Sequence, residues 1–129
     1  MVLDQASGGN WVPGGPSLYS ARQALALGAS VILVTNLSPG YPANALAGLD
    51  LVSTACRDVP RYVNSYDAEG NRQQRLLVTG APLDPAPSLF EGADALLFAP
   101  AFHELDETPA PASALLGVSL QGALRDLDG

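Results

Sequence analysis

The chain has 129 residues, enough for one domain with a hydrophobic core and too few for two. Six basic and 13 acidic residues give a net charge of −7, and every basic residue is an arginine. This balance argues against a nucleic-acid or anionic-membrane surface, since both need clustered positive charge. Charged residues make up 15% of the chain, below the roughly 25% usual in soluble domains, as expected of a sheet covered on both faces or of a surface that a partner covers.

No targeting or membrane-spanning segment is visible in the sequence. The N-terminus lacks a basic region followed by an apolar run, and the apolar runs elsewhere are far shorter than a membrane span. Cys56 is the single cysteine, so the chain cannot form an internal disulfide. We therefore predict a cytoplasmic protein that binds neither nucleic acid nor membrane.

The first expected elements surround a pair of glycines. Residues 1–4 are a short apolar lead that ends in Asp4, and residues 5–16 are a loop with a short strand near Trp11. Gly14 and Gly15 allow positive φ and let a ligand approach the main chain. The proline that follows suits the first position of a helix, which we expect over residues 16–27, with Gly28 ending it.

Short apolar runs recur after this helix. Residues 31–34 are continuously apolar, which is typical of a parallel strand covered on both faces. Residues 95–98 and 115–119 have the same character, and residues 49–52 are a further strand candidate. Short helical segments are expected over residues 43–47, from residue 88 to near Gly92, and near Glu104.

A β-hairpin is predicted over about residues 60–80. Strand-forming residues 61–66 and 73–79 flank a turn at residues 67–71 that contains Gly70 and Asn71. Tyr62 and Tyr66 fall on one face of this hairpin, and cross-strand packing alone can explain them. Helices and strands that alternate around one inserted hairpin predict an α/β fold.

Four features in this order resemble the ribokinase-like (PfkB-type) carbohydrate kinases. They are Pro13-Gly14-Gly15 before a helix that carries Ala-Leu-Gly-Ala near its end, a strand that reads Val-Ile-Leu-Val-Thr, the hairpin around Tyr66, and the strand Ala95 to Phe98 with the closing segment from Gly117 to Arg125. The resemblance covers almost the whole chain but only the N-terminal half of a complete kinase. It implies a single partial domain over residues 1–129, a three-layer α/β partial parallel sheet with the hairpin as a lid.

The resemblance also implies a substrate site. In that family a carboxylate at the end of the first strand binds sugar hydroxyls, and Asp4 stands in that place. The paired glycines would lie against the sugar. The lid would bring Tyr62, Asn64 or Tyr66 near a small sugar, polyol or nucleoside. Many family members have asparagine where this chain has Tyr19, so the sugar contacts here differ.

The family's Gly-x-Gly-Asp element, with its catalytic aspartate, is not found in this sequence. ATP and Mg²⁺ are implied for the complete family, but we expect neither to bind strongly to this chain, and we assign it no catalytic residue and no metal ligand. The absence of lysine excludes a Walker-type NTPase. His103 is expected to be structural, Cys56 a bystander thiol, and the acidic run that begins at Glu104 a solvated segment.

We therefore predict the substrate-binding half of an ATP-dependent sugar, polyol or nucleoside kinase, inactive alone. The alternative is a non-catalytic module that binds a ligand or a partner. Such a module would form a homodimer through the hairpin or associate with a missing C-terminal half.

Overall fold

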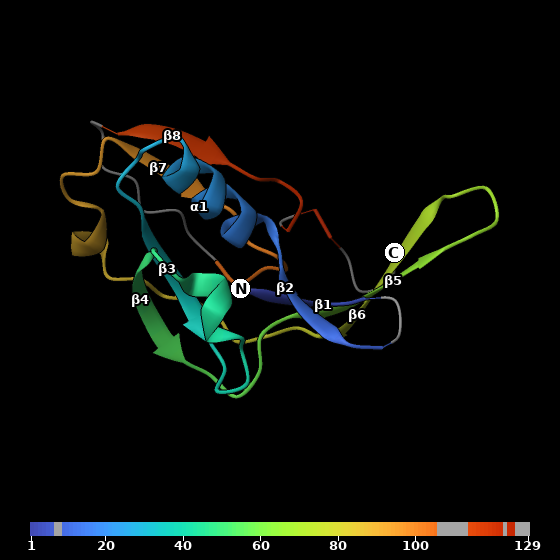
Figure 1. Cartoon of the computed structure of the whole chain (residues 1–129). Coiled ribbons are helices and arrows are strands. Elements are labelled where there is room, and N and C mark those ends of the chain that lie inside the picture. The colour runs from blue at the N-terminus through green and yellow to red at the C-terminus, as the bar shows by residue number, and fades with distance from the viewer. Residues whose placement is uncertain (7–8, 106–113, 123, 126–129) are drawn as a thin grey trace.

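The computed structural model describes residues 1–6, 9–105, 114–122 and 124–125 (Figure 1). Strands make up 36% of it and helices 17%. The strands are β1 (Val2–Gln5), β2 (Trp11–Gly14), β3 (Ile32–Leu37), β4 (Asp50–Ala55), β5 (Arg61–Tyr66), β6 (Arg72–Val78), β7 (Ala95–Phe98) and β8 (Leu115–Val118). The helices are α1 (Pro16–Ala26) and two single-turn 3₁₀ helices, η1 (Ala43–Leu46) and η2 (Pro87–Phe90).

The described strands form three separate sheets. The largest has the order β2-β1-β5-β6, in which β1 pairs antiparallel with β2 and parallel with β5. The other two sheets are parallel pairs, β3 with β4 and β7 with β8. Since β1 is an inner strand of the largest sheet, its side chains meet residues that lie far away in the sequence.

The expected three-layer α/β ribokinase-like sandwich is wrong. The arrangement is mostly β and β-solenoid-like, without one parallel sheet between helical layers. Such a sandwich needs helices on both faces of its sheet, and α1 is the one helix longer than a single turn in the described residues. Strands that we predicted to be covered on both faces therefore expose large apolar side chains. Ile32 on β3 is 60% exposed, and Leu97 on β7 is 54% exposed.

Helix α1 follows the sequence expectation within one residue at its C-terminal end. Gly15 precedes it with a φ of 95°, and Pro16 takes its first position. Gly28, with a φ of 88°, donates its N–H to the Leu25 carbonyl, and Ala29 donates to the Ala24 carbonyl. These two bonds form a Schellman motif, which satisfies carbonyls that the helix end leaves unpaired.

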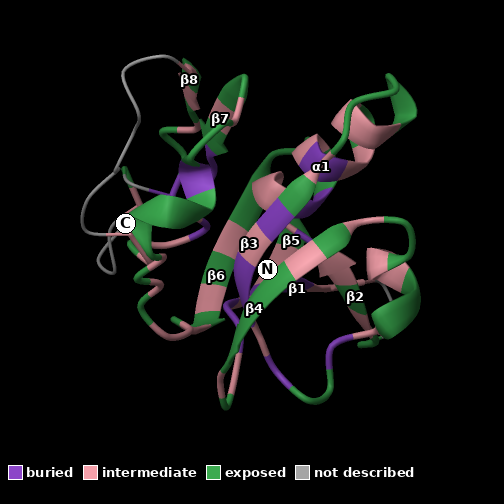
Figure 2. Cartoon of the chain, turned by 90° about the vertical axis from the view of Figure 1, so that its left-hand side faces the viewer, coloured by how far each residue is buried: buried purple, intermediate pink, exposed green. Residues whose placement is uncertain are grey.

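The main hydrophobic core lies where α1, β1 and β3 meet. Its buried members are Met1, Leu3, Leu18, Ala21, Leu33, Tyr41 and Val59. A smaller cluster of Val2, Tyr62 and Ala101 packs on the other side of β1. Figure 2 shows purple, buried residues along the inner elements and green, exposed ones over much of β8. Strand β1 is thus held from both sides, which fixes the position of its C-terminal end.

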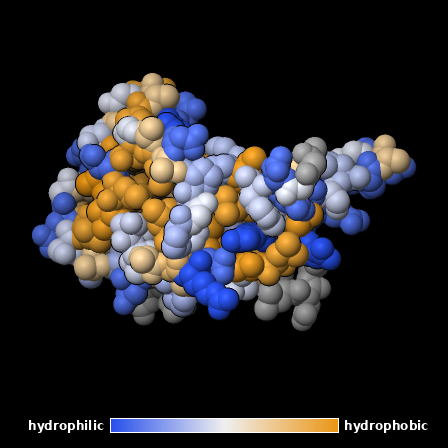
Figure 3. Space-filling view, turned by 60° about the horizontal axis from the view of Figure 1, so that its bottom comes forward, coloured by the Kyte–Doolittle hydropathy of each residue, from blue (hydrophilic) through white to orange (hydrophobic). Residues whose placement is uncertain are grey.

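The predicted hairpin is confirmed as β5 and β6, paired antiparallel. It projects from the rest of the molecule (Figure 1), and its distal part is mostly hydrophilic (Figure 3). Asp67 closes the turn, because its carboxylate accepts hydrogen bonds from the main chain of Glu69 and Asn71 and from the Asn71 side chain. The turn is thereby ordered by local polar contacts.

The remaining short elements differ in detail from the expectations. The helical segments near residues 43–47 and 88–92 are 3₁₀ turns, and the strand candidate at 49–52 extends to Ala55. No helix forms at residues 102–105; the Glu104 carboxylate instead accepts the N–H groups of Ala101 and Phe102, each at 2.7 Å. The rest of that helix candidate lies outside the described residues. Within the described part of the chain, no helix has the length and apolar character that crossing a membrane requires.

Candidate functional site

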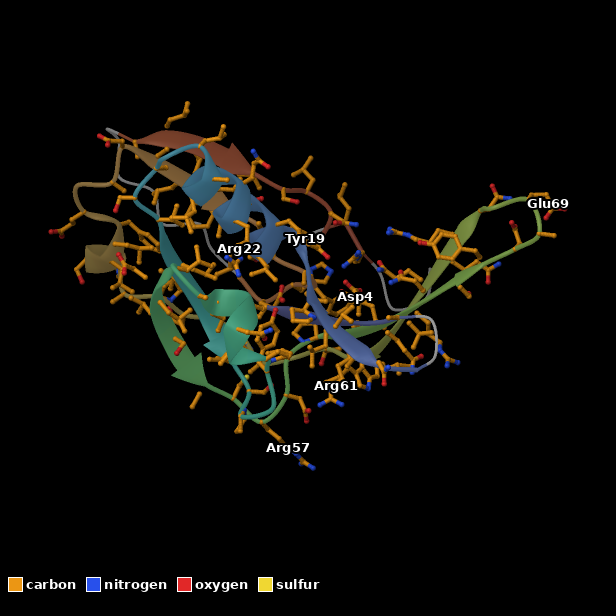
Figure 4. All side chains as sticks on the ribbon, viewed as in Figure 1. Asp4, Tyr19, Arg22, Arg57, Arg61 and Glu69 are labelled. Atoms are coloured by element: carbon orange, nitrogen blue, oxygen red, sulfur yellow. The ribbon has the colours of Figure 1, made fainter. Side chains whose placement is uncertain are left out.

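The candidate site is built around Asp4, a half-buried residue of β1. Its side chain rests against Gly14 of β2, and a Cβ atom at that position would collide with Asp4 Oδ2. The adjacent Gly15 has positive φ, and a Cβ there would lie 2.6 Å from a methyl carbon of Val2. The two glycines are therefore required by the close approach of β1 and by the turn into α1. Figure 4 shows Asp4 and Tyr19 near each other, between α1 and the base of the hairpin.

Four polar side chains form a hydrogen-bonded relay across the sheet, which we call the relay. Arg125 Nη2 donates to Gln74 Oε1, and Gln74 Nε2 donates to Asn64 Oδ1 at 2.9 Å. Asn64 Nδ2 then donates to Asp4 Oδ1 at 3.4 Å. A guanidinium can only donate and an ionised carboxylate can only accept, so the two ends of the relay fix the orientation of both amides between them.

A cavity of about 170 Å³ opens beside the relay, and all four relay residues line it together with Tyr19 and Tyr62. We call it the Asp4 pocket. A second hollow of about 390 Å³ lies next to it and shares Asp4 and Asn64, with Val12 and Tyr66 on its wall. The Asp4–Asn64 hydrogen bond therefore stands between two openings. Asp4 Oδ2 accepts no hydrogen bond from the described residues, so one carboxylate oxygen remains for a ligand.

Two tyrosines lie at or near the pocket: Tyr62 lines it, and Tyr41 is close to Asp4 and Tyr19. The buried Tyr62 hydroxyl donates to the Ala101 carbonyl at 2.8 Å. Burial raises the pKa of Tyr62, and the adjacent Arg125 opposes this shift only in part. Tyr41, which the sequence did not single out, is 7% exposed, and its hydroxyl has no hydrogen-bond partner among the described residues. Burial first, and then the nearby Tyr19 and Asp4, raise the pKa of Tyr41, so both phenols stay protonated at neutral pH.

The structure brings the residues predicted from sequence together. Asp4, Gly15, Tyr62 and Asn64 line the Asp4 pocket. Tyr66 lines the neighbouring hollow, and Gly14 supports the Asp4 carboxylate from behind.

Sequence reasoning missed Arg72, Gln74, Gln121 and Arg125, which also line the pocket. Side chains alternate between the two faces of the hairpin, and this alternation could have identified two of them. Gln74 and Arg72 sit opposite Asn64 and Tyr66 in the register and share their face. No local signal points to Gln121 or Arg125, because only the path of the chain after β8 carries them to the hairpin.

His103, Cys56 and Glu104 lie next to main-chain groups. His103 Nε2 lies 2.6 Å from the Arg125 carbonyl oxygen, and burial raises the pKa of Cys56, whose Sγ is 3.3 Å from the Asp58 carbonyl oxygen. Glu104 holds a turn, and the acidic residues that follow it lie outside the described residues. Among the described residues, no three His, Cys, Asp or Glu side chains gather as metal ligands would.

No protein-family model and no curated protein sequence matches the chain. The chemistry of the site therefore rests on its own residues.

Proposed function

We propose that the Asp4 pocket binds a small polyhydroxylated molecule, a sugar, polyol or nucleoside, as the acceptor-binding part of an ATP-dependent kinase. The observation that carries this proposal is the relay, which ends at the Asp4 carboxylate in the wall of the cavity. A cytoplasmic location fits this role and fits the single, free Cys56.

The residues offer what a polyol needs. Asp4 Oδ2 can accept a hydrogen bond from a ligand hydroxyl, and charge-assisted bonds of this kind are stronger than neutral ones. The Asn64 amide is held in one orientation, so a second hydroxyl meets a prearranged polar neighbour. Tyr19, which is 61% exposed, supplies apolar ring surface for the carbon skeleton of the ligand. A cavity of about 170 Å³ suits a molecule the size of a pentose or a small polyol.

The kinase role comes from the resemblance to ribokinase-like enzymes. Phosphoryl transfer requires a base, donors for the γ-phosphate and usually Mg²⁺. The residues present do not fit this part of the reaction. The chain has no lysine and no Gly-x-Gly-Asp element, and Asp4 is the one carboxylate lining the pocket. We accordingly assign this chain the binding of the acceptor and derive no transfer step on it.

Calorimetric titration with ribose, ribitol and adenosine tests the proposal. We expect one of them to bind, and we expect Asp4→Asn to weaken that binding about tenfold or more, because hydrogen bonds to charged groups contribute about 1.5–3 kcal/mol. Asp50→Asn is the matched control, since Asp50 is an exposed aspartate on β4 in a different sheet. If none of the three compounds gives a heat of binding, or if wild type and Asp4→Asn bind with equal affinity, the pocket is not a polyol site.

A second candidate function is self-association through the hairpin. Strand β6 is an edge of its sheet among the described strands, and its outward face carries Leu77, which is 47% exposed. An unpaired edge of this length can pair with β6 of a second copy about a two-fold axis. Sedimentation velocity on wild type and Leu77→Lys distinguishes the monomer from the dimer. A monomer at all concentrations would remove this candidate without affecting the polyol site.

A further inference from the structure

Two arginines, Arg72 and Arg125, line the Asp4 pocket on elements that lie far apart in the sequence. Arg72 begins β6, and Arg125 follows β8 by several residues. The whole chain contains only six basic residues and carries a net charge of −7. Placing two of these six around a single cavity with one carboxylate concentrates positive charge where the molecule has little of it.

Arg125 is held in a fixed position by neutral groups. Its guanidinium lies 4.4 Å from the centre of the Tyr62 ring, and Nη1 donates to the Ala101 carbonyl at 2.7 Å. Its third contact is the Gln74 side-chain oxygen within the relay. Stacking on an aromatic ring and bonding to neutral oxygens orient a guanidinium without neutralising its charge.

No carboxylate of the described residues forms an ion pair with either arginine. The ion pairs within the described ranges are those of Asp58 with Arg57 and with Arg61. The Ala101 carbonyl and the Gln74 oxygen take two of the five N–H donors of the half-buried Arg125 guanidinium. The remaining donors can bond to a carboxylate or a phosphate.

Arg72 presents the second charge from the hairpin. It pairs in register with Tyr66 and lies on the same face as Gln74, toward the pocket, while Arg75 lies on the opposite face. Arg72 is exposed and makes no side-chain hydrogen bond with the described residues, so it can turn toward a ligand without breaking a contact.

We propose that the ligand of the Asp4 pocket is an anionic polyol, a sugar acid or a sugar phosphate, whose anionic group lies against Arg125 and Arg72 while its hydroxyls meet Asp4 and Asn64. This inference rests on the proposed polyol site and adds the charge of the ligand. The carboxylate and the phosphate present the same chemistry to the two guanidinium groups.

Calorimetric titration with two matched pairs tests the inference: ribose against ribose 5-phosphate, and glucose against gluconate. We expect the anionic member of at least one pair to bind about tenfold or more tightly than its neutral partner, because charge-assisted hydrogen bonds are about twice as strong as neutral ones. The pair that shows the difference identifies phosphate or carboxylate as the anion. Inorganic phosphate alone serves as a probe for simple charge attraction.

Three variants test whether the effect belongs to the pocket. Arg72→Gln should weaken binding of the anionic ligand severalfold and leave the neutral sugar unchanged. Arg75→Gln, a neighbouring exposed arginine on the other face of β6, should change neither. Arg125→Lys keeps the charge but removes the planar donor array, and a thermal melt checks that it folds.

The outcomes separate this inference from the proposal on which it rests. Equal affinity for both members of each pair overturns the anion inference and leaves the polyol site standing. Equal losses in Arg72→Gln and Arg75→Gln also overturn it, since they would show general charge attraction. If no sugar of either kind binds, the polyol site itself fails.

Discussion

At the residue scale, Gly14 decides whether Asp4 can occupy its place. The glycine has no side chain, and the Asp4 carboxylate fills the space that a Cβ atom would take. Gly15 is required for a second reason, its φ of 95°, which a residue with a side chain adopts only with strain. The sequence alone does not distinguish these two reasons, because both read as a tight turn.

Replacing Gly14 by alanine should therefore damage the site more than the fold. The new methyl group would push the Asp4 carboxylate aside and break the hydrogen bond that Oδ1 accepts from Asn64, at a cost of about 1 kcal/mol in the free energy of unfolding. We expect ligand affinity to fall about tenfold, since the same carboxylate binds the ligand. Chemical denaturation and calorimetric titration measure the two effects.

Gly40→Ala is the control for this variant. A Cβ atom at Gly40 meets no atom within 4 Å, and its φ lies outside the left-handed region. Gly40→Ala should keep both stability and affinity. If Gly14→Ala binds ligand with the affinity of wild type, Gly14 does not have the role in positioning Asp4 that we assign to it.

At the element scale, the hairpin depends on Asp67 to close its turn. Hydrogen bonds from the Asn71 side chain first, and then from the main chain of Asn71, Glu69 and Gly70, lower the pKa of Asp67 below its ordinary 3.8. A depressed pKa means that the ionised form stabilises the folded turn. This contribution is complete above the ordinary pKa and is lost as pH falls through the lower folded value.

We predict that acidification below about pH 3.8 loosens the hairpin tip before the base of the hairpin. Asp67→Ala should have the same effect at neutral pH, whereas Glu69→Ala, which removes a side chain from the same turn without touching the Asp67 bonds, should not. Amide hydrogen exchange of Gly70 and Asn71 reports the difference. Unchanged exchange in Asp67→Ala would show that the strands alone hold the turn.

The sequence predicted individual elements better than their assembly. Gly15, Pro16 and Gly28 each act locally, so the helix they delimit was predicted almost residue by residue. The hairpin was predicted for the same reason, from its turn residues and flanking strands. Gln121 and Arg125 could not be predicted as site residues, because their positions depend on contacts with distant parts of the chain.

At the scale of the whole molecule, the apolar strands were misleading. A continuous apolar run is typical of a strand with both faces covered, but β3, β4, β7 and β8 form two isolated pairs with large exposed side chains. The number of covering helices, which is a property of the assembly, decides this point. The wrong prediction of the fold does not affect the candidate site. The site lies at the mixed sheet of β1, β2, β5 and β6, and the predicted strands that proved exposed belong to the parallel pairs.

We expect the 129-residue chain to transfer no phosphate from ATP to a sugar that it binds. The pocket offers one carboxylate and two guanidinium groups, and the sequence holds no Gly-x-Gly-Asp element to supply the base. A coupled assay for ADP release with ribose or ribose 5-phosphate checks this expectation. Sugar-dependent ADP release by the purified chain would assign it a catalytic group that we have not identified.

The most direct test of the central claim, that the Asp4 pocket is a ligand site, follows the side-chain amides by NMR during titration with the sugars above. The amide signals of Asn64 and Gln74 should shift together as ligand fills the pocket, since both belong to the relay. The Asn71 amide, bound to Asp67 at the hairpin tip, should stay in place. Shifts elsewhere with Asn64 and Gln74 unmoved, or no shifts with any sugar, would contradict the claim.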